Sequence, residues 1–150
     1  MTQRMDYNLV TPAGVKALGN VYGHILRSGL PKALVDLIYL RISQINGCAY
    51  CIDMHSRELL NEGITVEKLV LVPAWREGGG LFDNTERAAL AWTETVMRVA
   101  ETGVPDGGYE AVATMFDRKQ LDDLTIAIGM MNAYSWMAIS FSTPPAAVNQ

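Results

Sequence analysis

The stretch Asp36-Leu-Ile-Tyr-Leu-Arg-Ile-Ser-Gln-Ile-Asn-Gly-Cys48-Ala-Tyr-Cys51-Ile-Asp-Met-His55 contains both cysteines and one of the two histidines of the chain. Its first part belongs to a helix expected from about Pro31 to Ile45, which is apolar on nearly every side and should therefore be buried on several sides. Asn46-Gly47 breaks this helix, and the next is expected to run from about Cys48 to Glu62-Gly63. We therefore predict a Cys-x-x-Cys pair at the N-terminus of a central helix.

The rest of the chain shows apolar residues spaced three and four apart, and no segment alternates as a strand would. Further helices are expected at about 12–28, 66–72, 83–101, 109–116 and 119–139, with a flexible loop at 76–84. Asp83 and Glu86 should form a capping box at the start of one of them. We predict an all-α fold of six or seven helices, with residues 1–150 forming a single domain.

Composition narrows the classes of partner and location. Hydrophobic residues make up 49% and charged residues 19% of the chain, which suits a well-packed globule and hints at buried subunit contacts. The net charge is −4 with no basic cluster, so nucleic-acid binding is not expected. No signal peptide is expected in Met1 to Val10, and the uncharged run Leu124 to Phe141 is too polar for a good membrane span. The expected location is cytoplasmic, where close cysteines are more often catalytic or metal-binding than structural.

The Cys-x-x-Cys-x-x-x-His spacing places reactive groups on one helical face. Residues three and four apart on a helix are neighbours, so Cys48 lies beside Cys51, and Cys51 lies beside His55. A thiol reacts as its thiolate, and either a neighbouring imidazole or a helix N-terminus can stabilise that anion. The helix end favours Cys48 and the histidine favours Cys51, so geometry alone leaves the first reactive sulfur open.

The run from Leu40 to His55 resembles the core of the alkyl hydroperoxidase D (AhpD)-like branch of the carboxymuconolactone decarboxylase family. Trp75-Arg-Glu77 and Thr85-Glu-Arg-Ala-Ala-Leu-Ala-Trp92 resemble the same branch. The likeness is clear over about residues 15 to 100 and looser in the C-terminal helix. The family pattern is an acid, eleven residues and then Cys-x-x-Cys-x-x-x-His, and Asp36 stands at the position of the acid.

This resemblance implies a thiol-dependent peroxidase that needs no cofactor or metal. Cys51 would react with a small peroxide, Cys48 would resolve the product to a disulfide, and an external dithiol would reduce it. His55 would be the base, and Asp36 would orient it. The family also implies an all-helical homo-oligomer, either a trimer or a hexamer of dimers.

Two positions depart from the family pattern. Asp36 is one methylene shorter than the usual glutamate, so its relay to His55 would be longer or looser. Tyr50 stands between the cysteines, where the best-known peroxidases have a histidine, and it is expected to line the pocket or pack against a neighbour. Because a phenol transfers protons poorly near neutral pH, peroxidase activity would be modest or the substrate different.

Other uses of the same residues are weighed beside this one. The dithiol could serve a disulfide oxidoreductase or redox sensor without strong peroxide turnover, or the cysteines could be inert in an oligomeric binding protein. A zinc site would use Cys48, Cys51 and His55, with His24 or Asp36 as the fourth ligand. His24 by itself is better explained as a hydrogen-bonded structural histidine.

Overall fold

The computed structural model describes residues 2–149, which form nine α-helices and three short 3-10 helices and contain no strand. The all-α prediction is confirmed, but there are more helices than six or seven. One reason is a short extra helix near the start of the chain; another is that the predicted helix at 83–101 divides at Arg98. In order, the elements are α1 (Tyr7–Val10), α2 (Pro12–Leu26), α3 (Lys32–Asn46), α4 (Ala49–Asn61), α5 (Val66–Leu71), η1 (Val72–Glu77), η2 (Gly79–Leu81), α6 (Asn84–Met97), α7 (Val99–Thr102), α8 (Asp106–Ala113), α9 (Arg118–Ser140) and η3 (Ala146–Asn149).

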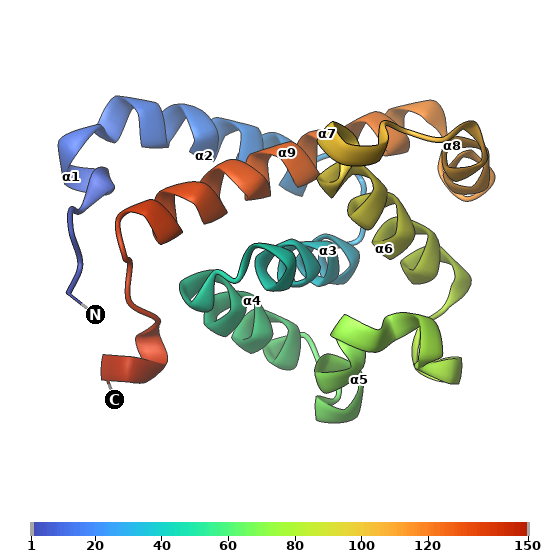
Figure 1. The fold of residues 1–150 in the computed structure, drawn as a ribbon, viewed down its shortest axis with the longest axis horizontal. Coiled ribbons are helices and arrows are strands. Elements are labelled where there is room, and N and C mark those ends of the chain that lie inside the picture. Colours follow the sequence, from blue (N-terminus) through green and yellow to red (C-terminus); the bar gives the residue numbers. More distant parts are fainter. Residues whose placement is uncertain (1, 150) are drawn as a thin grey trace.

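Helix α3 is the centre of the fold, with α2 and α9 above it, α4 below it and α6 beside it in Figure 1. Most of its apolar residues are almost completely removed from solvent, as for Leu37, Ile38 and Ile42, whereas Ile45 near its C-terminal end is 39% exposed. Two of its polar residues are buried as well, because Asp36 and Ser43 are 2% and 0% exposed. The prediction of a helix buried on several sides is therefore confirmed, and its burial explains how the next helix is held in place.

The break between α3 and α4 has a local cause. Gly47 ends α3 with φ at 68°, a left-handed conformation that glycine adopts without steric cost. Cys48 then takes extended backbone geometry as the N-cap of α4. The amide of Cys48 donates to the carbonyl of Ser43 at 2.9 Å, which ties the start of α4 to the last turn of α3.

The segment predicted as a flexible loop at 76–84 is instead folded, so this prediction is wrong. It contains the last two residues of η1 and all of η2, and the Arg87 side chain donates to the carbonyls of Arg76, Gly79 and Phe82. The glycine run in this segment suggested flexibility. The hydrogen bonds that order the segment come from Arg87, which lies further along the chain. The predicted capping box of Asp83 with Glu86 follows directly and is confirmed.

A buried carboxylate joins the far side of α3 to η1 and α6. Glu94 accepts from Arg41 at 2.8 Å, from the indole of Trp75 at 3.0 Å and from Arg76 at 2.5 Å. Burial alone would raise the pKa of Glu94, but these hydrogen bonds hold it below its usual value. In the part of the chain that the structure describes, none of the helices combines the length and apolarity needed to span a bilayer.

Candidate functional site

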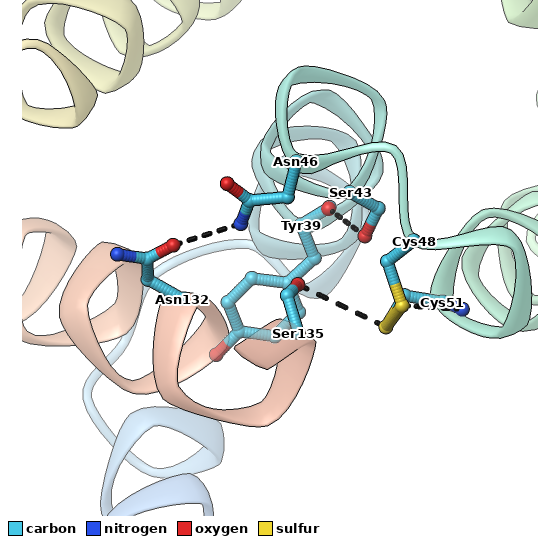
Figure 2. The surroundings of a disulfide bond; sticks show 7 residues. All are labelled: Tyr39, Ser43, Asn46, Cys48, Cys51, Asn132 and Ser135. Atoms are coloured by element: carbon cyan, nitrogen blue, oxygen red, sulfur yellow. Dashed lines mark hydrogen bonds between the residues drawn. A yellow bond between two sulfur atoms is a disulfide. The ribbon is translucent and has the colours of Figure 1, made fainter. Parts of the chain in front are cut away.

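The two cysteines form a disulfide at the start of α4, facing α9 (Figure 2). Their side chains are buried, and their Cα atoms lie 5.3 Å apart. As the N-cap, Cys48 places its Sγ 3.3 Å from the amide of Cys51, which donates to it. The Ser135 hydroxyl of α9 donates to Cys51 Sγ at 3.8 Å. Each sulfur therefore has a hydrogen-bond donor beside it, which is the environment that stabilises a thiolate.

The surrounding contacts hold this arrangement from two neighbouring helices. Ser43 donates its hydroxyl to the carbonyl of Tyr39 within α3, while Asn46 at the end of α3 donates to Asn132 of α9 at 2.8 Å (Figure 2). The Asn46–Asn132 bond fixes the end of α3 against α9. The site is therefore built from α3, α4 and α9, and α3 packs more extensively against α4 and α9 than against the other described elements.

His55 lies one helical turn after Cys51 and is 4% exposed. Its Nδ1 is 2.8 Å from Oε2 of Glu58, and among the residues that the structure describes its Nε2 has no hydrogen-bond partner. The hydrogen bond to His55 lowers the pKa of Glu58. This assigns the proton to Nδ1 when the imidazole is neutral and leaves Nε2 as the acceptor. Sequence analysis missed Glu58, although its i,i+3 spacing from His55 was a readable signal.

Asp36 lies near His55 but is not its direct hydrogen-bond partner. One atom each from Asp36, His55 and Glu58 lie within 4.8 Å of one another. Oδ2 of Asp36 accepts from Lys32 at 2.5 Å, and Lys32 also pairs with Glu62. Burial raises the pKa of Asp36 to about 6, despite the hydrogen bond from Lys32. The role of Asp36 as a relay to His55 stays a prediction.

Tyr39 is a second residue that sequence analysis did not connect with the site. Its ring lies 5.3 Å from the imidazole of His55, and it is 1% exposed. Its buried hydroxyl has no partner within the described residues, and burial raises its pKa, so the hydroxyl keeps its proton. Nothing in the sequence distinguishes this tyrosine, because it looks like one more apolar position on α3.

Two cavities adjoin the disulfide, one lined by Cys51 and the other by Cys48. The first, of about 360 Å³, is lined by Cys51, His55 and Glu58, together with Tyr7, Asn8, Val15, Tyr22, Tyr39, Tyr50, Met54, Met130, Met131 and Tyr134. The second, of about 420 Å³, is lined by Cys48, with Gly47, Ala49, Tyr50, Ala138, Ile139, Ser142, Thr143, Pro144, Pro145 and Val148. Tyr50 is half-buried and lines both, so it stands between them. We call them the Cys51 cavity and the Cys48 cavity.

The residues proposed as zinc ligands are arranged differently in this structure. Cys48 and Cys51 are joined to each other, and His24 bonds Asp123 of α9 at 2.7 Å, as a structural histidine would. Asp36, His55 and Glu58 form the one close cluster of ligand types found in residues 2–149. Asp36 accepts from Lys32, and His55 is bonded to Glu58, so each of the three side chains already has a hydrogen-bond partner.

Comparisons with known proteins agree with this geometry. The model of the carboxymuconolactone decarboxylase family matches residues 12–95. The chain is 31% identical to the uncharacterized protein YdfG of Bacillus subtilis over 146 residues, covering 97% of this chain and 99% of that protein. It is also 35% identical to an alkyl hydroperoxide reductase AhpD of Corynebacterium aurimucosum, over 51% of this chain and 40% of that protein.

A solved structure extends the likeness to nearly the whole fold. It is a protein of unknown function from Agrobacterium tumefaciens, described as a candidate antioxidant defence protein AhpD. The two superpose with a TM-score of 0.91 at 34% identity, over 96% of this chain and 98% of the other. The family match over more than half of the chain and this full-length likeness lead to one conclusion: the chain is an AhpD-like member of the carboxymuconolactone decarboxylase family.

Proposed function

We propose that the chain is a thiol-dependent peroxidase that reduces small organic hydroperoxides through the Cys48–Cys51 dithiol. The observation that carries this proposal is the shared cavity. Cys51 and His55 line the same cavity, and Cys48 is already bonded to Cys51 in the disulfide. The AhpD names of several relatives support the same activity.

In the oxidative step, the thiolate of Cys51 attacks one oxygen of the hydroperoxide. The O–O bond breaks, an alcohol leaves after protonation, and Cys51 becomes a sulfenic acid, oxidised by two electrons. The thiol of Cys48 then attacks that sulfur, a disulfide forms and water leaves. Overall, two thiols and one hydroperoxide give one disulfide, one alcohol and one water.

His55 is suited to remove the proton of Cys51. Its Nε2 is the ring nitrogen left free by the bond from Nδ1 to Glu58, and it would accept the thiol proton directly or through water. The imidazolium that forms would be stabilised by the Glu58 carboxylate. Asp36 would act behind this pair, as a positioning group whose charge adds to the field at His55.

The lining of the Cys51 cavity favours an organic hydroperoxide over a peroxide that has no apolar group. Three methionines and a valine supply apolar surface, while tyrosine hydroxyls supply a few donors. The Tyr39 ring lies beside that of His55, and its buried hydroxyl is without a partner among the described residues, so it would be free to donate to a peroxide oxygen. Such a site would take a compact alkyl or aryl group next to the reactive O–O bond.

The test is hydroperoxide consumption with dithiothreitol as reductant. We expect Cys51→Ser to abolish turnover, and Cys48→Ser to stop turnover while still allowing a sulfenic acid to form on Cys51, trapped with dimedone. Undiminished turnover in both variants would reject the proposal.

A second candidate uses the same dithiol without peroxide turnover, as a disulfide oxidoreductase or redox sensor. The observation in its favour is Tyr50, which lines both cavities and follows Cys48 and Ala49 at the position where the best-known peroxidases of the family have a histidine. The oxidation rate of the reduced protein separates the two, because a sensor would still exchange disulfides but would react with hydroperoxide no faster than a free thiol.

The prediction of a homo-oligomer remains part of the proposal. Trp136 and Ile126 on α9 are 61% and 38% exposed, so large apolar side chains remain uncovered on this helix. They support a subunit contact along the outer face of α9. Sedimentation of the intact protein would distinguish a monomer from a trimer or a hexamer.

A further inference from the structure

We propose that Met54 is a modification site, where a hydroperoxide bound in the Cys51 cavity oxidises the thioether to a sulfoxide once the dithiol is spent. The inference rests on one part of the proposed function, the entry of a hydroperoxide into this cavity, and it does not require Cys51 to react. The structure holds the two cysteines as a disulfide, and the cavity is present beside them in that state. A hydroperoxide that enters the oxidised protein therefore meets the cavity without its thiols.

Thioethers are the sulfur nucleophiles that remain on the wall of the cavity in the disulfide form. The lining contains three of them, Met54 from α4 and Met130 and Met131 from α9. The two methionines of α9 are 5% and 3% exposed, whereas Met54 is half-buried. A sulfur reacts only when it presents a lone pair to the peroxide oxygen, so Met54 should be the first of the three to be oxidised.

Met54 lies on the same part of α4 as the groups that a bound hydroperoxide would contact. It follows Cys51 by three residues, so the Cβ atoms of the two are about 5–6 Å apart on the helix surface, and His55 comes next in the chain. All three residues line the cavity. A hydroperoxide placed with its O–O bond near Cys51 is therefore also held close to the thioether, which raises its effective concentration there.

The reaction balances without a further reactant. The Met54 sulfur attacks the terminal oxygen of the hydroperoxide, a sulfur–oxygen bond forms and the O–O bond breaks. The proton of the terminal hydroxyl moves to the departing alkoxide, which leaves as an alcohol. Sulfur is oxidised by two electrons and the hydroperoxide is reduced by two, and the product is a polar, chiral sulfoxide. A thioether has no proton to lose, so this step needs no base.

The test uses the intact native protein in its disulfide form, mixed with excess tert-butyl hydroperoxide either in buffer or in urea. The samples are desalted, reduced, alkylated and digested with trypsin, and the sulfoxide at each methionine is measured by mass. Met115 is the internal reference, because it is 39% exposed and does not line the Cys51 cavity. It also falls in a different tryptic peptide from Met54.

Exposure by itself would make Met115 the faster of the two to react, and binding in the cavity reverses that order. We expect Met54 to be oxidised at least about five times faster than Met115 in the folded protein, and the two rates to lie within about twofold of each other in urea. Oxidation of Met115 in the folded protein at the same rate as Met54, or faster, overturns the inference.

The stereochemistry of the product gives a second readout on the native chain. A thioether approached only from the cavity presents one of its two lone pairs, so the folded protein should form mainly one sulfoxide epimer at Met54. Two sulfoxide reductases, MsrA and MsrB, each repair one epimer. Applied to the digested peptides, one of them should repair more than about three quarters of the Met54 sulfoxide from folded protein, but about half of that from protein oxidised in urea. Equal repair by both enzymes in the folded sample would refute oxidation from a bound state.

A pair of variants tests the route of entry. Val15→Phe adds bulk at a half-buried residue of the Cys51 cavity, and Val66→Phe adds the same bulk at a residue of α5 that is 57% exposed and outside the cavity lining. We expect Val15→Phe to slow oxidation of Met54 relative to Met115 by about threefold or more, and Val66→Phe to leave this ratio unchanged. A native ratio in folded Val15→Phe would contradict entry through the cavity. If Val15→Phe does not fold, the rates and epimers of the native chain decide.

Failure of this inference and failure of the proposed function give different results. If reduced protein consumes the hydroperoxide rapidly while Met54 of the disulfide form is spared, the peroxidase proposal stands and the modification site is rejected. If Met54 is oxidised selectively while the reduced protein reacts only at the rate of a free thiol, the modification site stands and the peroxidase proposal is rejected.

Discussion

Replacing Glu58 with glutamine removes one negative charge from the hydrogen bond to His55 while keeping the shape of the side chain. In the native protein Oε2 lies 2.8 Å from Nδ1, and the imidazole is nearly fully buried. If His55 takes the proton of Cys51, the imidazolium is stabilised by that carboxylate only after proton transfer. Interactions that strengthen on the way to the transition state change the rate, so the variant should react more slowly.

The size of the effect follows from the exposure of the pair. A hydrogen bond to a charged group contributes roughly 1.5–3 kcal/mol. The Glu58 side chain is 36% exposed, which screens the charge, so the lower end of this range applies. The glutamine oxygen still accepts from Nδ1 and keeps part of the interaction. We expect a loss of about 1 to 1.4 kcal/mol, or about five- to tenfold in rate.

The assay is the stopped-flow reaction of fully reduced protein with excess tert-butyl hydroperoxide at pH 7. Glu101→Gln is the matched control, because it removes the same charge from an exposed residue of α7. A Glu58→Gln rate equal to the native rate, or an equal fall in the control, would refute the role of Glu58 as the partner of His55.

Three further predictions concern stability, each read by urea unfolding. Because folding raises the pKa of Asp36 to about 6, the native chain holds this proton to higher pH than the unfolded chain. The free energy of unfolding of the native protein should therefore fall by up to ~3 kcal/mol relative to that of Asp36→Asn as the pH rises from about 4 to about 6. A difference in unfolding free energy between the two proteins that does not change with pH would contradict this. Glu94→Gln should cost roughly 2–3 kcal/mol, because it leaves Arg41 without its carboxylate, and a loss below that of an exposed Glu→Gln change would disprove it. Ile38→Ala should cost roughly 2–5 kcal/mol against about 1 kcal/mol for Ile38→Val, since Ile38 is 0% exposed; equal costs would argue against a tightly packed α3.

The sequence predicts well where local signals act alone. The backbone at residue 47 is left-handed, which favours glycine, and Asp83 and Glu86 form the reciprocal hydrogen bonds of a capping box. Helix α3 carries apolar residues on nearly every side. The helix break, the cap and the burial of α3 could therefore be anticipated from the sequence. Cys48 at the start of α4 follows from the same break. These features depend on residues within a few positions of one another, which a single sequence displays.

Features that depend on distant residues were not predictable. The order of residues 76–84 comes from Arg87, and the burial of Glu94 comes from Arg41 on another helix. Tyr39 becomes a site residue only because α4 brings His55 to its ring. Glu58 differs from these cases. It is local to His55, and the family pattern drew attention to Asp36 in its place.

The most direct test of the central claim is a single turnover of the reduced protein with one equivalent of tert-butyl hydroperoxide. Because a positioned base contributes about a hundredfold or more, we expect oxidation at least ~100 times faster than that of free cysteine. The products should be one Cys48–Cys51 disulfide and one tert-butanol for each hydroperoxide consumed. Oxidation at the rate of free cysteine, or hydroperoxide left unconsumed while both thiols remain reduced, would contradict the account.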